Sequence, residues 1–197
     1  MNESEFVYLE VQDDNGLSIR RFKCLLKAAK MSSFLSEMME HTITDDNFTN
    51  GTILPLPRKH CSQYAVEQII KWSEYHCDDP SVNQQIQNRS FDEDENDTTD
   101  SGEISCYWDR NFMHNIASPT GLTAESRSNL YDLLIASHFL GIDRLTDLGA
   151  KFLCKLIAGK SCEEVRALLN IANDFQPDEE RILHDQIAWS ERAKRSQ

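Results

Sequence analysis

The chain has 197 residues, 40% of them hydrophobic, and a formal net charge of −13 at pH 7. This length suits one compact domain, or one domain with an appended subdomain, and the apolar content is enough to bury a core. Binders of nucleic acid or anionic membranes carry clustered lysine and arginine, so the acidic balance argues against both kinds of partner. It suits basic protein partners, or solubility alone, equally well.

The N-terminal residues predict no export signal, because no basic region followed by an apolar stretch stands there. No apolar run approaches the roughly 20 residues that a membrane-spanning helix needs. We therefore expect a protein of the cytoplasm and nucleus. In such a reducing compartment its six cysteines are expected to be free thiols, and its Asn-X-Ser/Thr sequons to be chance matches.

A β-hairpin is predicted at the start of the chain. Phe6–Val11 is rich in β-branched and aromatic residues, and Leu17–Phe22 alternates apolar with polar residues. Asn15 and Gly16 lie between the two runs, and both residues tolerate the positive φ angles of a tight type I′ turn. The two runs are therefore expected to pair as antiparallel strands.

Two short helices and a further strand are expected next. Lys23–Lys30 contains no proline or glycine, and Ser32 and Ser33 can cap a helix over Phe34–Glu40. Thr52–Pro57 is then a short apolar run closed by prolines. Because proline supplies no donor to a sheet, this run is predicted to be an edge or terminal strand.

The segment Ser62–His76 is predicted to be an amphipathic helix that ends before Pro80. Its apolar residues fall roughly on one face, and they are Tyr64, Ala65, Ile69, Trp72 and Tyr75. We expect this face to be the buried one.

The composition changes abruptly over residues 81–105. Five of the six residues from Asp92 to Asp97 are acidic, and mutual repulsion keeps such a run extended. We interpret the segment as a disordered, solvated linker. Two alternatives remain open, namely a docking tail for a basic partner and a phosphorylation site at Ser90.

The second half of the chain is predicted to be helical. Trp108–Met113 forms a short helix or turn, and 115–127 forms a loop that contains a Ser-Pro-Thr-Gly run. A helix then covers Ser128–Leu140, with Gly141 at its C-terminal cap.

Three more helices are expected after Gly141. The first covers 142–158, and the third starts at Pro177, which suits a first helical turn, and extends to 192. The second begins at a capping box in which Ser161 and Glu164 satisfy each other's backbone amides, and it continues through Leu169.

No motif for catalysis, for a cofactor or for a metal is present. The chain has no phosphate-binding glycine loop and no nucleophile elbow. His60 and Cys61, like His76 and Cys77, are adjacent pairs that lack the spacing of zinc ligands. Cys162 lies in a first helical turn, but two glutamates follow it and oppose formation of the thiolate. We therefore predict no catalytic residues, no metal and no cofactor.

Several strings in the sequence resemble one protein family when they are taken in order. They are Ile53–Pro57, Ile69–Trp72, His76–Pro80, the acidic run, Trp108 and Asp109 with Phe112, Leu133–Ala136, Gly159–Arg166, Asn170–Phe175 and Trp189. This ordered set resembles the S-phase-kinase-associated adaptors of SCF ubiquitin ligases, over Phe6 to Trp189.

The resemblance implies an α/β protein of the α+β type. Its BTB/POZ fold would combine a small sheet and helices with a C-terminal helical extension that binds F-box proteins. The domains would be an N-terminal BTB half over 1–80, the acidic linker over 81–105, the helical remainder of the BTB fold over 106–158 and the partner-binding subdomain over 159–197.

The resemblance also implies a function without catalysis, in which the chain bridges an F-box substrate receptor to the N-terminal domain of a cullin. The residues expected to bind the F-box are Leu153, Ile157, Val165, Leu169, Ile171, Asn173, Asp174, Phe175, Ile187 and Trp189. Trp189 would be an anchor, since tryptophan is enriched at binding hot spots. An alternative reading makes Leu153 and Leu169 ordinary core residues. Because Trp189 and its neighbours lack a complete core, 177–192 is expected to be partly disordered in the free protein.

Two departures from the family pattern affect these expectations. The chain inserts roughly ten residues around Ser118 and Gly121 beyond the family pattern. His138 and Phe139 also stand where the family usually has an Asn-Tyr pair that faces the cullin. The amide and the phenolic hydroxyl are lost, and each lost interfacial hydrogen bond costs roughly 0.5–1.5 kcal/mol. Cullin binding at His138 and Phe139 is therefore expected to be weaker than in the family, or the partner to differ.

Three alternatives to the bridging adaptor follow. The first is a scaffold that sequesters F-box proteins and does not bind cullin. The second is a BTB-type structural protein that self-associates, with weak homodimers forming at micromolar concentration. The third is an enzyme that depends on a reactive cysteine or on zinc. None of these readings involves nucleic acid or a membrane.

Overall fold

The computed structural model describes residues 5–12, 18–42, 51–79, 104, 106–118, 121–176, 178–179 and 181–182. The predicted turn at Asn15 and Gly16, most of the acidic linker including Ser90, and the last helix beyond Ile182 lie outside the described residues. The chain divides into two units, Met1–Ala158 and Gly159–Gln197. Each unit is considered by itself below.

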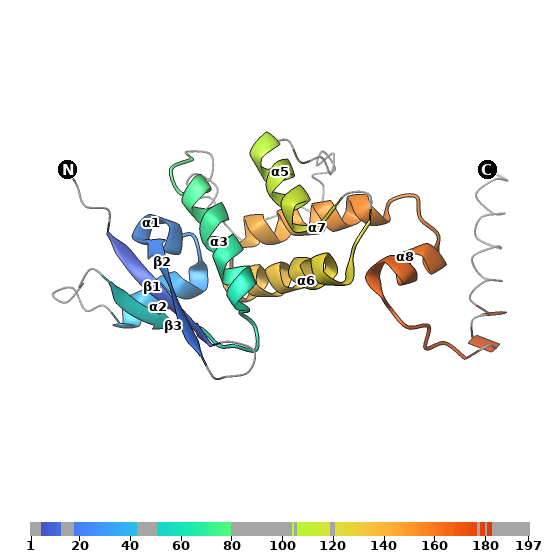
Figure 1. The fold of residues 1–197 in the computed structure, drawn as a ribbon, viewed down its shortest axis with the longest axis horizontal. Coiled ribbons are helices and arrows are strands. Elements are labelled where there is room, and N and C mark those ends of the chain that lie inside the picture. The colour runs from blue at the N-terminus through green and yellow to red at the C-terminus, as the bar shows by residue number, and fades with distance from the viewer. Residues whose placement is uncertain are drawn as a thin grey trace, which may run out of the picture. The chain divides into compact units, whose positions relative to one another are not determined.

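The described strands form one three-stranded sheet in the first unit (Figure 1). β1 (Phe6–Gln12) lies in the centre, β2 (Ile19–Leu25) pairs with it antiparallel, and β3 (Thr52–Pro55) pairs with it parallel. The pairing of β1 with β2 confirms the predicted hairpin strands. The position of β3 at an edge confirms the prediction from its prolines.

Alternation along β1 determines which face of the sheet is buried. Val7, Leu9 and Val11 are fully buried, whereas the residues between them are half-buried. Leu9 is paired with Phe22 on one side and with Leu54 on the other, so the three strands direct apolar side chains to one core face.

The predicted helix over Lys23–Lys30 is wrong in its first three residues. Lys23 and Cys24 continue β2, opposite Tyr8 and Val7, and the helix α1 covers only Leu26–Ala29. The side chain of Cys24 is buried on the core face of the sheet, so tertiary pairing outweighs the local helical pattern here.

The second short helix, α2 (Ser33–Thr42), begins where its cap was expected. The Ser32 hydroxyl accepts a hydrogen bond from the Leu35 amide at 3.0 Å and donates one to the Leu140 carbonyl oxygen. Ser32 is therefore both a helix cap and a buried link to the second half of the unit.

The long helix α3 (Gln63–His76) begins at Ser62, whose hydroxyl accepts from the Ala65 amide at 3.2 Å. One residue predicted for its buried face, Tyr75, is 51% exposed. The helix packs against α1 and β2 as well as against a later helix, so its buried stripe is wider than one line of residues and includes Val66, Ile70 and His76. Tyr75 lies outside that stripe.

The later helices of the first unit that lie in the described residues are α5 (Tyr107–Ile116), α6 (Ala124–Phe139) and α7 (Asp143–Ile157). The loop predicted over 115–127 is therefore too long. Thr123 caps α6 by accepting from the Ser126 amide at 3.1 Å, so the helix starts four residues before the predicted Ser128. Gly141 has a φ angle of +65°, which fits the glycine predicted to end this helix.

The second unit begins with α8 (Cys162–Leu169), and both bonds of its predicted capping box are present. The Ser161 hydroxyl accepts from the Glu164 amide at 3.3 Å, and the Ser161 amide donates to the Glu164 carboxylate at 2.8 Å. The helix ends at Asn170, which adopts a left-handed conformation with a φ angle of +56°.

Candidate partner-binding surfaces

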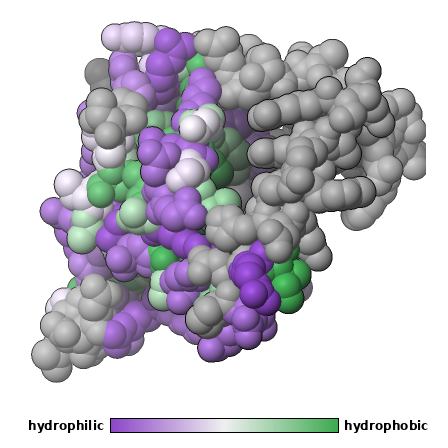
Figure 2. Space-filling model, turned by 90° about the vertical axis from the view of Figure 1, so that its right-hand side faces the viewer, coloured by the Kyte–Doolittle hydropathy of each residue, from purple (hydrophilic) through white to green (hydrophobic). Residues whose placement is uncertain are grey.

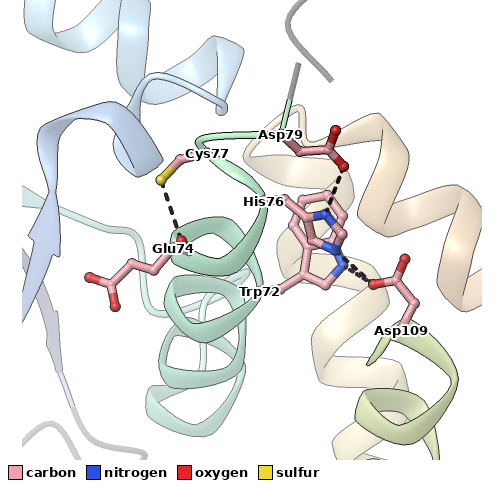
Figure 3. A network of polar contacts seen from close by, with 6 residues as sticks. All are labelled: Trp72, Glu74, His76, Cys77, Asp79 and Asp109. Atoms are coloured by element: carbon pink, nitrogen blue, oxygen red, sulfur yellow. Dashed lines mark hydrogen bonds and ion pairs between the residues drawn. The ribbon is translucent and has the colours of Figure 1, made fainter. Parts of the chain in front are cut away.

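A buried polar network connects the end of α3 to the start of α5 (Figure 3). The Asp109 carboxylate, 8% exposed, accepts a hydrogen bond from Trp72 Nε1 at 3.0 Å and lies 2.8 Å from His76 Nε2. The other ring nitrogen of His76 lies 3.8 Å from a carboxylate oxygen of Asp79. Asp109 thus satisfies two buried ring nitrogens from α3 and fixes α5 against that helix.

A line of stacked aromatic rings reinforces the same junction. The rings of Tyr75 and Trp108 are 4.0 Å apart and almost parallel, and the rings of Trp108 and Phe112 are 5.2 Å apart. This stack accounts for Tyr75, which is exposed on α3 yet covers one face of Trp108. We interpret the network and the stack as structural, because the Asp109 carboxylate is directed at two buried ring nitrogens and the aromatic rings cover one another.

The three buried cysteines of the first unit are poorly suited to act as nucleophiles. All six cysteines are free thiols, and Cys24, Cys61 and Cys77 are buried. Burial raises the pKa of the Cys24 and Cys61 thiols to about 12 and also raises the pKa of Cys77. These thiols stay protonated near neutral pH, and a thiol is a poor nucleophile compared with a thiolate.

The described residues show neither a cluster of metal-ligating side chains nor a membrane-spanning helix. No group of three or more His, Cys, Asp or Glu side chains in this part of the chain is arranged to hold a metal ion. No helix among the described residues is long and apolar enough to cross a membrane.

The residues predicted to face a cullin lie together at the end of α6. His138 is exposed, and Phe139 is half-buried. The Phe139 ring lies 4.8 Å from the ring of Phe34 on α2 and 4.8 Å from the ring of His60, in the loop before α3. Phe34 and His60 were not predicted for this surface. In the sequence, His60 stands out only as a possible zinc ligand. Its proximity to Phe139 arises from the tertiary fold, so no sequence pattern indicates it.

Two of the residues predicted to bind an F-box belong to α7 in the first unit. Leu153 and Ile157 are half-buried, whereas Phe152 and Leu156 on the same helix are buried in the core. The reading of Leu153 as a core residue is therefore only partly correct, since its side chain remains accessible to a partner.

The other described residues of the predicted set belong to the second unit. Val165 and Leu169 on α8 are half-buried, and no residue of this helix is fully buried. The exposed members of the set are Ile171, Asn173, Asp174 and Phe175. Ile187 and Trp189 lie outside the described residues, so their predicted role is not tested.

Local contacts give the segment after α8 a defined form. The Phe175 amide donates to the side-chain oxygen of Asn173 at 3.3 Å, and the Arg166 guanidinium lies 5.5 Å from the centre of the Phe175 ring. Ile171 and Phe175 nevertheless remain 54% and 43% exposed. The space-filling view shows hydrophobic residues, coloured green, among hydrophilic ones on one face of the described surface (Figure 2).

Comparison with known proteins places these features in a wider group. Residues 143–190 match the family described as "Skp1 family, dimerisation domain". A "Skp1-related protein" of Caenorhabditis elegans is 30% identical over 154 residues, which cover 78% of this chain and 76% of the relative. The "Suppressor of kinetochore protein 1" of Schizosaccharomyces pombe is 32% identical over 143 residues, or 70% of this chain and 75% of the relative. The "E3 ubiquitin ligase complex SCF subunit sconC" of Talaromyces marneffei is 30% identical over 137 residues, or 70% and 74%.

Proposed function

The chain belongs to the Skp1 family, and from this premise we propose that it is an adaptor subunit of an SCF-type ubiquitin ligase. Several relatives carry the name of an SCF subunit. The adaptor carries out no chemistry of its own. It holds a substrate receptor close to the ligase, which raises the effective concentration of substrate lysines at the active enzyme.

The exposed apolar residues of the second unit support binding of F-box proteins. α8 buries none of its residues completely, although it carries Val165 and Leu169, and the segment after it exposes Ile171 and Phe175. Leaving such side chains in water is unfavourable, and covering them with the helices of a partner stabilises the complex by roughly 25 cal/mol per Å² of apolar surface. This set of accessible apolar residues is the observation that carries the proposal.

We propose that the cullin binds the first unit at the surface around His138 and Phe139. The exposed imidazole and the half-buried phenyl ring provide an aromatic contact without the hydroxyl of a tyrosine. The bridging role requires this second contact, whereas F-box binding by the second unit does not.

Co-purification followed by size-exclusion chromatography tests the two contacts separately. The chain is mixed with an F-box domain, with a cullin N-terminal domain and with both. We expect Ile171→Ala to weaken the F-box complex, because Ile171 is 54% exposed in the second unit. Ile19→Ala is the matched control, since Ile19 is 57% exposed but lies on β2 of the first unit.

The outcomes distinguish the adaptor from its alternatives. An F-box complex that Ile171→Ala weakens and Ile19→Ala does not supports the adaptor. Failure of the chain to bind the F-box domain would reject it. Elution of the chain alone as a concentration-dependent dimer would then favour the self-associating structural protein.

A sequestering scaffold is a second candidate, because His138 and Phe139 replace the pair that usually faces a cullin in this family. Such a scaffold binds F-box proteins and withholds them from other adaptors. Binding of the F-box domain together with no binding of any cullin N-terminal domain would identify it. For either role we propose the cytoplasm and nucleus as the place of action, which imaging of a tagged chain in cells can test.

A further inference from the structure

The surface around Phe139 is assembled from three separate segments of the first unit. Phe34 comes from α2, His60 from the loop between β3 and α3, and Phe139 from the end of α6. The His60 ring lies nearly parallel to the Phe139 ring, with 10° between the planes, and the Phe34 ring meets Phe139 at 49°. Phe139 thus contacts two other rings, each from a different segment of the unit.

Backbone bonds keep these segments in place. The Phe34 amide donates to the Leu140 carbonyl oxygen at 3.3 Å, and the His60 amide donates to the Pro57 carbonyl oxygen at 3.1 Å. Gly141 allows the close approach of α2 to the end of α6, since a Cβ atom there would lie 1.9 Å from Ser33 Oγ. The three rings are therefore arranged before a partner binds, which lowers the entropy lost on binding.

An accessible aliphatic side chain extends this surface. Ile135 is 50% exposed and stands three and four residues before His138 and Phe139 on α6. Residues at this spacing lie on the same side of a helix. Ile135 and Phe139 thus form an apolar strip, with His138 beside them and the ring of His60 at its end.

The loop that carries His60 also carries two cations. Arg58 and Lys59 are both exposed, and neither forms an ion pair with another residue in the part of the chain that the structure describes. On the helices that carry the rings the neighbouring charges are acidic: Glu37 stands three residues after Phe34 on α2, and Asp132 stands three residues before Ile135 on α6. In a chain with a net charge of −13, an uncompensated pair of cations beside an apolar strip favours a partner with acidic residues at that edge.

Resting on the adaptor function proposed above, we propose that the cullin binds a surface made of five side chains, namely Phe34, His60, Ile135, His138 and Phe139. The 58–60 loop at the border of this surface selects which partner binds. The partner chemistry that fits is an amphipathic helix whose apolar side covers Ile135 and Phe139 and whose border carries Asp or Glu toward Arg58 and Lys59. His60 acts as a positioning residue, because its ring fixes the orientation of the Phe139 ring.

The test measures the affinity of a cullin N-terminal domain for the chain in complex with an F-box domain, at low and at high salt. We expect the double variant Arg58→Glu with Lys59→Glu to bind about tenfold more weakly and to lose most of the salt dependence of the wild type. The control, Arg20→Glu with Lys23→Glu, makes the same change of charge on β2, at the opposite edge of the sheet from β3. It is expected to bind within about twofold of the wild type.

His60 is tested by two substitutions in the same assay. His60→Ala removes the stacking partner of Phe139 and is expected to weaken cullin binding several-fold. His60→Phe keeps a flat ring and is expected to restore binding, whereas neither variant changes the affinity for the F-box domain. Thermal melting of both variants shows whether any loss arises from unfolding, and a loss of affinity in folded His60→Ala with rescue by His60→Phe supports the positioning role.

The outcomes separate this inference from the adaptor function. Equal cullin affinity of the Arg58/Lys59 and Arg20/Lys23 double variants would overturn the role of the loop and leave the adaptor intact. Binding of the F-box domain without any binding of a cullin domain by the wild type would overturn both this inference and the bridging role. Cullin binding that depends on Arg58 and Lys59 in a chain that binds no F-box domain would support the inference and reject the adaptor.

Discussion

The two units of the chain differ in where their apolar side chains go. Every fully buried residue in the described part of the chain lies in the first unit, from Val7 to Leu156. In the second unit α8 has a complete capping box but buries no residue. The first unit therefore closes its own core, whereas the second has a locally stabilised backbone and an apolar surface that a partner can cover. This contrast predicts that mutations in the first unit act mainly on stability and those in the second mainly on binding.

The largest expected effect compares one leucine from each unit. Leu133 on α6 is completely buried, so Leu133→Ala should lower the free energy of unfolding by about 2–5 kcal/mol. Leu169 on α8 is half-buried, so Leu169→Ala should lower it by less than about 1 kcal/mol in the free chain while weakening the F-box complex. Urea denaturation measures the free energy of unfolding of both variants. Equal losses of stability in the two variants would show that the second unit has a core of its own.

The polar network within the first unit gives the next effect. Asp109→Ala leaves Trp72 Nε1 and His76 Nε2 without their buried acceptor, at a cost of roughly 2–4 kcal/mol in unfolding free energy. Asp109→Asn keeps one acceptor oxygen and should lose less. Urea denaturation of both variants checks the difference. If Asp109→Ala were as stable as the wild type, the network would not contribute to holding α5 on α3.

A smaller effect depends on pH. Burial, followed by the nearby charges of Glu74 and Cys77, raises the pKa of the Cys24 thiol to about 12. An unfolded thiol ionises near pH 8.5, so above about pH 9 the unfolded chain releases this proton while the folded chain retains it. The free energy of unfolding should therefore fall as pH rises from about 9 to 12.

Replacing Cys24 should remove part of the decrease in the free energy of unfolding at alkaline pH. Cys24→Ala is expected to reduce the loss of stability between pH 8 and pH 10 by about 1–2 kcal/mol. Cys154→Ala, at an exposed thiol of the same unit, is the control. Urea denaturation at pH 8 and pH 10 measures the free energy of unfolding of each variant. Identical pH dependence in the Cys24→Ala variant and the wild type would show that the Cys24 thiol does not cause the loss of stability.

The smallest expected effect concerns the cap of α8. Ser161→Ala removes the hydroxyl that accepts from the Glu164 amide and should destabilise this helix by about 1 kcal/mol. Amide hydrogen exchange of residues 162–169 should become faster, with no change in the amides of α6. Lys160→Ala, one residue before the cap, should have little influence. Unchanged exchange in Ser161→Ala would mean that packing, and not the cap, stabilises the helix.

The features that the sequence predicted correctly depend on local chemistry. The capping residues Ser32 and Ser161, the glycine at 141 and the prolines of β3 each act on backbone only a few residues away, and the structure confirms all of them. The errors arise where distant segments meet. Lys23 and Cys24 are strand residues because β1 pairs with them, and Tyr75 is exposed because the buried stripe of α3 runs through Trp72, Ser73 and His76 instead.

The same distinction applies to the candidate surfaces. His138 and Phe139 are adjacent in sequence and could be identified together, whereas the contacts of Phe139 with Phe34 and His60 depend on the tertiary fold. No pattern in the sequence connects the three segments. The predicted F-box residues of α8 and the segment after it could be proposed from the family resemblance, but only the structure gives their exposure.

Gly141 has a consequence at the level of genetics. A side chain at this position would be strained by the φ angle of +65° and would press on Ser33, and so it would separate α2 from the end of α6. The aromatic surface would lose its arrangement, while the residues proposed to bind F-box proteins lie elsewhere in the chain. If the aromatic surface binds the cullin as proposed, a Gly141→Ala allele whose product still folded would act dominantly. Its product would occupy F-box receptors without delivering them to the ligase, and the severity of the phenotype would follow the ratio of mutant to wild-type protein.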